Sequence, residues 1–411
     1  MRGLLKSIGP AIIVAAVVLG PGSILTSSKV GATFGLLGLP VVVCAAVLMI
    51  GMVVLSAWLG AVYEGSLCTE LRERLGSGVT IAIGVILFVL VALFQSSNNI
   101  ALIGGLEALF GESEWSLGMR LGTLLVFNGL IVASLYLLRN LYSSVERLMK
   151  FLIGLMSLAF LVNLVVAYSR PRGYVLVEPT ETPNLLPLLG MIGTTFSVGG
   201  AFYQAYLVKE KGWGLGDVRK GLTDSVASIS VLGIMTMAIL LTSYRVFYGH
   251  EEPVVLSSVG EVALQLEPLF GPWARVVFAS GILAGALSSF LVNCLIGGTV
   301  MSDSLEKGAR LSDSGPVHLT ALALVIGMGV AMMFFAREGS TVVLITIAQA
   351  MTVLGIPALA AALVYLGTRK DLEGERKVPA PIIGIAGLGF LVSCGLACLT
   401  AVKVYGKLTG E

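Results

Sequence analysis

Long apolar segments are the feature of this 411-residue sequence that most constrains its fold. A helix needs about 20 mostly apolar residues to cross about 30 Å of hydrocarbon. Hydrophobic residues make up 56 % of the chain and charged residues 12 %. Soluble domains contain fewer hydrophobic residues and about twice the share of charged ones. The sequence therefore predicts an all-α, polytopic membrane protein with eleven transmembrane helices, at about 10–33, 38–63, 79–105, 119–138, 149–168, 186–208, 221–243, 273–301, 317–335, 340–366 and 380–403.

The remaining composition narrows the function classes. Net charge is +2, so no strong field indicates a nucleic-acid partner. The five cysteines lie scattered without the CxxC spacing of a metal site, and the two histidines fall near predicted span ends. The sequence shows no nucleophile–base constellation and no phosphate loop. We expect no enzyme, no cofactor and no nucleic acid, with the lipid bilayer as one partner.

Lys and Arg residues indicate how the chain is inserted. Of the 26 such residues, 17 lie at the N-terminal end and on alternate loops, whereas the opposite loops and the C-terminal tail carry 8. Basic residues collect on the cytoplasmic side of membrane proteins. We therefore expect a multi-pass protein of the cell membrane, inner or plasma, with a cytoplasmic N-terminus and an external C-terminus.

Two apolar segments are interrupted near their midpoints. The first breaks at Gly20-Pro21-Gly22-Ser23, and the sixth, five spans later, breaks at GTTFSVGG, residues 193–200. Proline removes a backbone donor and glycine permits unusual dihedral angles, so both helices should unwind there. Unwound backbone at that depth must line a cavity or be buried in protein. Matched breaks in two halves are typical of inverted-repeat transporters, although close helix packing also selects small residues.

This organisation predicts a single transmembrane transporter domain over residues 1–411. Its inverted repeats would cover about 10–168 and 186–366, with an extra helix at about 380–403. The substrate would bind at the membrane midplane, between the two broken helices. The oligomeric state stays open.

Several segments resemble one transporter family. GPGSILTSSKVGATFG resembles the first-helix segment of the Nramp family, and MIGTTFSVGGAFYQAYLVKEK falls on its sixth-helix segment. LSAWLGAVYEGSLCTELRERLG, ASGILAGALSSFL and ITIAQAMTVLGIPALA are similar to its second, eighth and tenth helices. The resemblance implies a LeuT-type fold with a 5+5 inverted repeat and broken helices 1 and 6, and it implies secondary transport of divalent metal ions.

The residues at the family's metal-binding positions differ in this chain. The family binds metal through an Asp and an Asn on helix 1, an Ala carbonyl and a Met sulfur on helix 6, and in some states a Gln on helix 10. The corresponding positions here are Gly20, Ser23, Thr194, Ser197 and Gln349. A carboxylate and a soft sulfur are therefore missing, although a buried divalent cation needs compensating charge.

The family's proton route differs as well. Gln95 and Asn98 occupy the places of its acidic pair, and Gly199 occupies the place of its sixth-helix His. Amides do not titrate, so we expect no proton coupling by the family's route. Asp224, at the start of the seventh span, resembles an acidic residue of the family, and it is either part of the coupling path or a structural cap.

Hydroxyl groups and helix N-termini at the breaks then favour a small anion. The half-helices carry about half a positive charge at each N-terminus, and Lys29 adds a full charge unless it snorkels to the interface. We expect secondary transport of a small inorganic anion, with bicarbonate as a candidate, and no bound metal. The substrate-binding residues would be Gly20, Pro21, Gly22, Ser23, Thr26, Lys29, Thr194, Thr195, Ser197 and Gln349, with Gln95, Asn98, Gly199 and Asp224 along the path.

Two alternatives stay open at this point. A divalent cation transporter of the Nramp type would bind hydrated Mg²⁺ or Mn²⁺ through water to hydroxyls and carbonyls. A receptor or scaffold on a transporter fold usually adds a soluble signalling domain, which this sequence does not show. Tyr203 and Gln204, one to two turns beyond the second break, are expected either to line the cytoplasmic exit or to pack against neighbouring helices.

Overall fold

All regular secondary structure in the described residues is helical. This computed structural model describes residues 9–110, 115–138, 141–169, 171–172, 174–177, 185–250, 256, 272–336 and 341–409, which contain no strand. The α-helices are α2 (Ala11–Val18), α3 (Pro21–Phe34), α4 (Gly38–Val62), α5 (Leu67–Leu75), α6 (Ser77–Phe110), α7 (Leu117–Leu137), α8 (Leu141–Ser169), α9 (Leu186–Thr195), α10 (Val198–Glu210), α11 (Val218–Phe247), α13 (Pro272–Ser304), α14 (Ser314–Ala336), α15 (Thr341–Gly367) and α16 (Ala380–Thr409).

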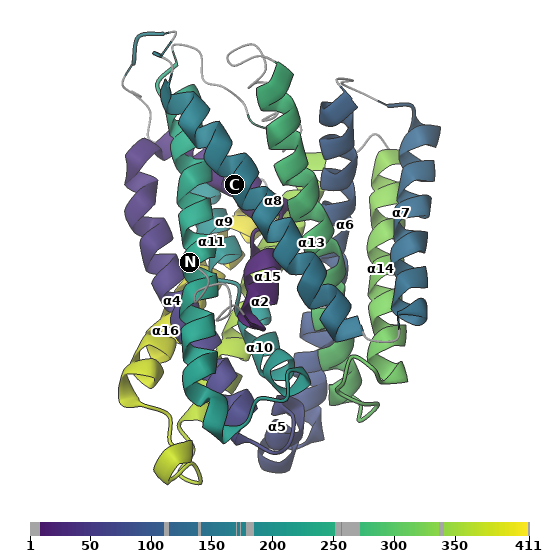
Figure 1. Cartoon of the computed structure of the whole chain (residues 1–411), viewed down its shortest axis with the longest axis vertical. Coiled ribbons are helices and arrows are strands. Elements are labelled where there is room, and N and C mark those ends of the chain that lie inside the picture. The colour runs from purple at the N-terminus through teal and green to yellow at the C-terminus, as the bar shows by residue number, and fades with distance from the viewer. Residues whose placement is uncertain are drawn as a thin grey trace.

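The long helices form one elongated bundle (Figure 1). Every predicted span overlaps one helix, or two consecutive helices where the sequence predicts a break: α2 with α3, and α9 with α10. Within the described residues, eight stretches are long and apolar enough to cross a membrane. Half-helices such as α9 and α10 are not among these eight stretches, because neither is long enough to span a membrane alone. The predicted fold class is confirmed.

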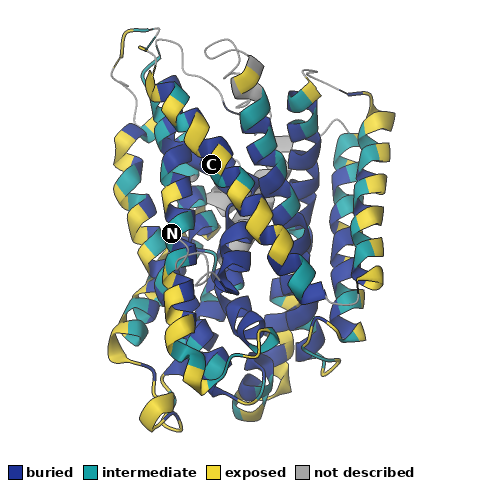
Figure 2. Ribbon diagram, in the orientation of Figure 1, coloured by how far each residue is buried: buried dark blue, intermediate teal, exposed yellow. Residues whose placement is uncertain are grey.

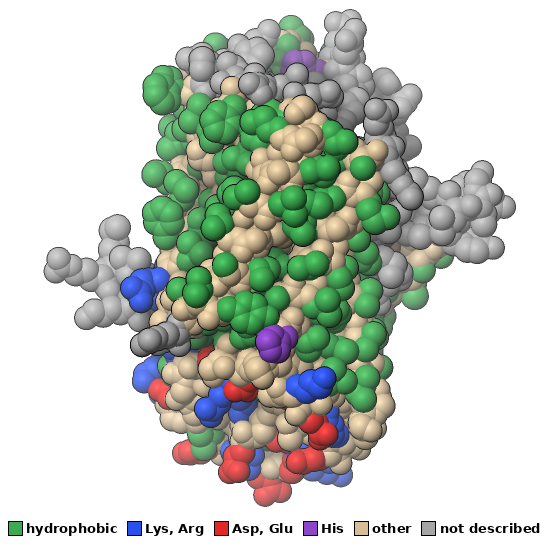
Figure 3. Space-filling view, turned by 90° about the vertical axis from the view of Figure 1, so that its right-hand side faces the viewer, with side chains coloured by type: hydrophobic (Ala, Val, Ile, Leu, Met, Phe, Trp, Pro, Cys, Tyr) green, Lys and Arg blue, Asp and Glu red, His purple; other side chains and the backbone are tan. Residues whose placement is uncertain are grey.

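Side chains on the outside of the bundle are largely apolar. Figure 2 shows buried residues along the inside and exposed residues on the outer faces of the peripheral helices. Leu125 and Leu130 on α7, and Phe151 and Leu158 on α8, are all more than half exposed. Figure 3 shows hydrophobic side chains over the middle of one face, with Lys, Arg, Asp and Glu gathered at its lower end. Lipid covers such a belt, so the chain is a multi-pass membrane protein.

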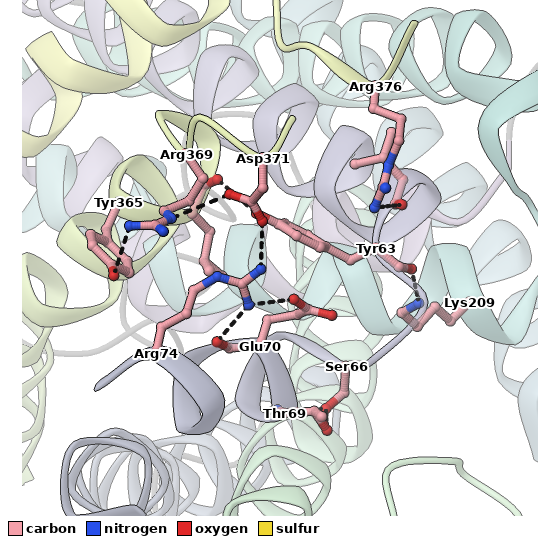
Figure 4. A network of polar contacts seen from close by, with 12 residues as sticks. Tyr63, Ser66, Thr69, Glu70, Arg74, Lys209, Tyr365, Arg369, Asp371 and Arg376 are labelled. Atoms are coloured by element: carbon pink, nitrogen blue, oxygen red, sulfur yellow. Dashed lines mark hydrogen bonds and ion pairs between the residues drawn. The ribbon is translucent and has the colours of Figure 1, made fainter. Parts of the chain in front are cut away.

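A network of charged side chains joins several helices at the lower end of Figure 1, which we call the α5 end (Figure 4). Arg74 of α5 donates to Glu70 at 2.5 Å and to Asp371, between α15 and α16, at 2.7 Å. Lys209, in the last turn of α10, donates to the carbonyl of Tyr63 at 2.7 Å. The bond from Arg74 holds the pKa of the Asp371 carboxyl below its usual value, so the link is lost only in acid.

The N-terminus of α2 is capped by α11. All eight residues of α2 are buried. Asp224 of α11 accepts hydrogen bonds from the backbone N–H groups of Gly9 and Ala11 at 2.6 and 2.8 Å, and Ser228 donates to the same carboxylate at 3.2 Å. The first N–H groups of a helix have no partner within the helix and need such acceptors. Asp224 therefore caps a helix, which is one of the two roles that the sequence allows for it.

We expect Asp224→Ala to lower the free energy of unfolding by about 1–3 kcal/mol, because two buried N–H groups lose their acceptor. Asp224→Asn keeps one acceptor oxygen and should lose less. Thermal unfolding in detergent measures both variants. Thr223→Ala, at the exposed neighbouring position, is the matched control. An Asp224→Ala protein as stable as the wild type would contradict the capping role.

Candidate functional site

Both predicted breaks are present in the structure. α2 ends at Val18 and α3 begins at Pro21, with Gly20 extended before it at φ −84° and ψ −179°. Pro21 lies in the first turn of α3, where the missing N–H costs no intrahelical bond. α9 ends at Thr195 and α10 begins at Val198. α3 packs against α9, and α2 packs against α10, so the four half-helices bring the two breaks together.

Two threonine hydroxyls connect the broken helices. The hydroxyl oxygens of Thr26 on α3 and Thr194 on α9 lie 3.2 Å apart. Each hydroxyl also has an acceptor in its own helix, the carbonyl of Gly22 at 2.8 Å for Thr26 and that of Gly190 at 2.9 Å for Thr194. A hydroxyl has one proton and two lone pairs. Whichever of these acceptors each proton takes, oxygen lone pairs of the two threonines are left for a ligand.

Helix α13 closes the site on another side. Ser288 and Ser289 are fully buried and donate to the carbonyls of Ala16 and Val17, each at 2.8 Å. These carbonyls belong to the last turn of α2, where no intrahelical donor is available. A Cβ atom at Gly20 would collide with the Ser289 hydroxyl. The chain therefore cannot hold a larger side chain at position 20 unless Ser289 moves.

The serines of α13 are site residues that the sequence reasoning missed. The sequence indicates a helix for the segment that contains them, but the spacing of two adjacent serines does not indicate which faces they occupy. The signal that points to them is their number: two buried hydroxyls in an apolar span need acceptors, and the end of a broken helix offers free carbonyls.

Several hydroxyls near the breaks have no partner. The side-chain oxygens of Ser23, Ser27 and Thr195 are buried, and none makes a hydrogen bond among the described residues. Ser197 begins α10 as its N-cap without a side-chain capping bond. Buried polar groups are almost always hydrogen-bonded to protein or water. Unpartnered oxygens on α3 and at the end of α9 therefore indicate a place for water or a ligand.

The remaining predicted binding residues are less closely defined. Lys29 is half-buried on α3, one turn before the end of that helix. Gly199 lies on the first turn of α10, where an added Cβ would come within 3.2 Å of Leu87. The side chain of Gln349 lies outside the described residues.

A row of amides lies on the predicted path. Gln95 and Asn98 are buried, and the Asn98 amide donates to Gln95 Oε1 at 3.1 Å. Asn99 donates to the Gln95 carbonyl at 2.9 Å, and Asn128 of α7 donates to Asn99 at 2.8 Å. The expected lack of proton coupling along this row stays a prediction. Asp224, the fourth residue of the predicted path, caps α2 instead of joining the row.

Polar groups also lie beyond the second break, on α10. Tyr203 and Gln204 are almost fully buried. The Tyr203 hydroxyl lies beside Thr299 of α13, and the two polar atoms of Gln204 have no hydrogen-bond partner among the described residues. The lining of an exit and packing against neighbouring helices both stay predictions for these residues.

Comparisons with known proteins agree with this geometry. A family model described as Natural resistance-associated macrophage protein-like, Nramp, matches residues 11–403. The chain is 24 % identical over 415 residues to the divalent metal cation transporter MntH of Verminephrobacter eiseniae. This match covers 98 % of this chain and 89 % of that protein. It is 26 % identical over 386 residues to the protein of that name from Yersinia pestis, with 90 % and 88 % covered.

A solved structure is similar over the whole chain. It is a mutant of the manganese transporter of Eremococcus coleocola, with a TM-score of 0.79, 19 % sequence identity, and coverage of 100 % of this chain and 88 % of that one. At this identity the likeness shows the fold. It agrees with the LeuT-type arrangement in which the first and sixth helices are broken.

The predicted anion selectivity, with bicarbonate as candidate, is wrong. The matching relatives are named as divalent metal cation transporters. That prediction treats the hydroxyls at the breaks as donors, whereas Thr26 and Thr194 have backbone acceptors in their own helices. It also leaves out the C-terminal ends of α2 and α9, which carry partial negative charge. With two broken helices in a bundle of this fold and a family model over residues 11–403, the chain belongs to the Nramp family of membrane transporters.

Proposed function

We propose that this protein transports a divalent metal cation, Mg²⁺ or Mn²⁺, which binds between the two broken helices. The observation that carries the proposal is the Thr26–Thr194 pair, whose oxygens lie 3.2 Å apart while each proton has an acceptor in its own helix. Neutral oxygen atoms suit hard cations. Relatives that match nearly the whole chain carry the name divalent metal cation transporter, and this name supports the same substrate class here.

We infer that the ion keeps much of its water shell. Within the described residues, no group of three or more His, Cys, Asp or Glu could hold a bare metal ion. A buried charge without compensation is costly, whereas Mg²⁺ gives up water reluctantly and usually keeps several waters when bound. The unpartnered oxygens of Ser23, Ser27 and Thr195 are suited to bind these waters. Such a site favours hard, hydrated ions over soft ones.

We also infer how the chain is arranged in the membrane. The α5 end carries Arg74, Lys209 and Arg376, and basic residues collect on the cytoplasmic side. The α5 end would then be cytoplasmic, and the cation would leave there after uptake across the cell membrane. The two inverted repeats would cover about 10–168 and 186–366, each beginning with one of the broken helices.

Uptake into proteoliposomes tests the proposed function. We expect the wild-type protein to take up both Mn²⁺ and Mg²⁺, and Thr26→Val and Thr194→Val each to weaken the apparent affinity about tenfold, since a polar contact to a charged ligand contributes about 1.5–3 kcal/mol. Initial rates over a range of ion concentrations give these affinities.

Thr33→Val is the matched control for these variants. Thr33 lies on α3 and donates to the carbonyl four residues earlier, as Thr26 does, but it is exposed. We expect its affinity to equal that of the wild type. Wild-type vesicles that take up neither ion would rule out the proposed function. If Thr26→Val and Thr194→Val had the same apparent affinity as Thr33→Val, the threonine pair would not be the site.

The close contact between positions 20 and 289 gives a second prediction. Gly20→Asp alone should lower the free energy of unfolding by about 1–3 kcal/mol, the usual cost of overpacking, because the new Cβ collides with Ser289. The double variant Gly20→Asp with Ser289→Gly removes the collision and adds a carboxylate at the break. We expect it to bind Mn²⁺ at least about tenfold more tightly than the wild type, since a charged contact exceeds about 1.4 kcal/mol.

Thermal unfolding and calorimetric Mn²⁺ titration in detergent measure these two effects separately. Ser289→Gly alone is the control, because it removes the hydroxyl without adding charge. If Gly20→Asp were as stable as the wild type, the predicted collision would be wrong. If the double variant bound Mn²⁺ no better than Ser289→Gly, position 20 would not face the ion.

A further inference from the structure

The segment that follows α8 is fastened to the end of α11, at the end of the bundle opposite the α5 end (Figure 1). The Tyr174 hydroxyl donates to the carbonyl of Tyr248 at 2.8 Å, and the Val177 N–H donates to the carbonyl of Gly249 at 2.9 Å. These two bonds join groups that lie outside the helices. They hold in place the short segment that carries Arg172.

Two arginines and two tyrosines face one another across these helix ends. The Arg172 guanidinium lies over the ring of Tyr244 on α11, with its Cζ atom 4.7 Å from the ring centroid. The Arg245 guanidinium of α11 lies over the ring of Tyr168 on α8, with its Cζ atom at 5.6 Å. Each segment thus supplies a cation to a ring of the other, and two positive charges lie on one pair of helix ends.

The half-buried Arg172 side chain has N–H groups without an acceptor. Its Nε and Nη1 atoms are buried, and neither makes a hydrogen bond among the described residues. Contact with the face of a ring leaves the N–H groups at the edge of the guanidinium plane open. Buried polar groups are almost always hydrogen-bonded, and a guanidinium bonds most strongly to carboxylate or phosphate. These N–H groups therefore indicate an anionic ligand.

Arg245 shows the more ordinary role of an arginine at such a place. Its Nε donates to the carbonyl of Ala167, in the last turn of α8, at 3.3 Å, as basic side chains near helix C-termini often do. The corresponding Nε of Arg172 has no such acceptor in the described part of the chain. Helix capping therefore does not account for Arg172.

The lipid-facing surface of α8 ends beside this cluster. Val165 is 66 % exposed, and Tyr168, in the last turn, is 48 % exposed. Tyrosine rings collect where the hydrocarbon of a membrane meets the headgroups. Because the Arg245 guanidinium lies over the Tyr168 ring, the cluster lies at the depth where phospholipids carry their phosphate groups.

We propose that Arg172, with Tyr244 and Arg245 beside it, binds the phosphate group of a membrane lipid in the leaflet opposite the α5 end. The N–H groups of Arg172 donate to the phosphate oxygens, and the charge of Arg245 adds to the attraction. The acyl chains lie along the apolar outer face of α8. This lipid is bound at the end of the bundle, away from the breaks, and it is not transported.

Native mass spectrometry of the full-length protein in detergent, with dioleoylphosphatidylglycerol added, tests the site. We expect one tightly bound lipid per chain, and Arg172→Gln to weaken its affinity about tenfold, the effect of losing one hydrogen bond to a charged group. Arg172→Lys keeps the charge without the planar guanidinium, so its affinity should lie between the two. Arg219→Gln is the matched control, because it removes an exposed arginine at the other end of α11, and it should bind as the wild type does.

Two further ligands separate the sources of phosphate. Dioleoylglycerol has the same acyl chains without phosphate, and inorganic phosphate has no acyl chains. We expect each to bind at least about tenfold more weakly than the phospholipid, since each lacks one of its two kinds of contact. Inorganic phosphate that bound as tightly as the phospholipid would overturn the lipid as the occupant. Equal affinities for the two lipids, or for the wild type and Arg172→Gln, would overturn the phosphate site.

Thermal unfolding of the wild type keeps the test decisive if Arg172→Gln fails to fold. A ligand that binds only the folded protein raises its unfolding temperature. We expect dioleoylphosphatidylglycerol to raise it more than dioleoylglycerol does at the same concentration, and Arg172→Lys to reduce that difference. If both lipids raised the unfolding temperature of the wild type equally, the phosphate site would be wrong. Neither measurement involves a metal ion, so the outcome is independent of the proposed function.

Discussion

Peptide groups at the two helix breaks impose the constraint on which the rest of the structure depends. In hydrocarbon every backbone N–H and C=O group needs a partner from the protein, and a broken helix exposes several at once. Ser288 and Ser289 of α13 supply donors to the end of α2, and Asp224 of α11 supplies acceptors to its beginning. A short buried helix is thereby held between two long ones, with its open end at the candidate site.

The sequence could predict the features that depend on local chemistry. The length of the apolar segments gives the helices, because the bilayer sets that length. Gly20 and Pro21 give the first break, since glycine and proline act on the backbone of their own positions. The structure has α2 and α3 separated at these residues. The second break follows from a less specific pattern of glycine and hydroxyl residues, and it too is present.

Contacts between distant segments could not be predicted in the same way. Ser289 meets Gly20, and Tyr206 meets Asp303, across 269 and 97 positions of sequence. Which face of a long apolar helix bears a serine or an aspartate depends on the packing of its neighbours. Asp303 also lies at the end of a span, where a solvated carboxylate is ordinary, so its burial became visible only with α5 and α10 in place.

The substrate class shows the same limit at the level of single atoms. A hydroxyl is donor and acceptor, so a ring of Ser and Thr side chains is compatible with an anion or with a hydrated cation. The choice depends on where each proton lies, and that depends on backbone carbonyls such as those of Gly22 and Gly190. Composition at the break therefore identifies a polar site and does not by itself give the sign of the charge that the site favours.

Gly20 and Ser289 form one steric unit, and this unit relates the missing carboxylate to the rest of the site. Ser289 occupies the space that a side chain at position 20 would need, and its hydroxyl is bonded to the carbonyl of Val17. The same hydroxyl thus completes the end of α2 and excludes a charged ligand residue there. The break therefore has the oxygen atoms of neutral side chains where a carboxylate could have stood. A site of this kind binds a hydrated cation more weakly than a carboxylate would, and weak binding favours release.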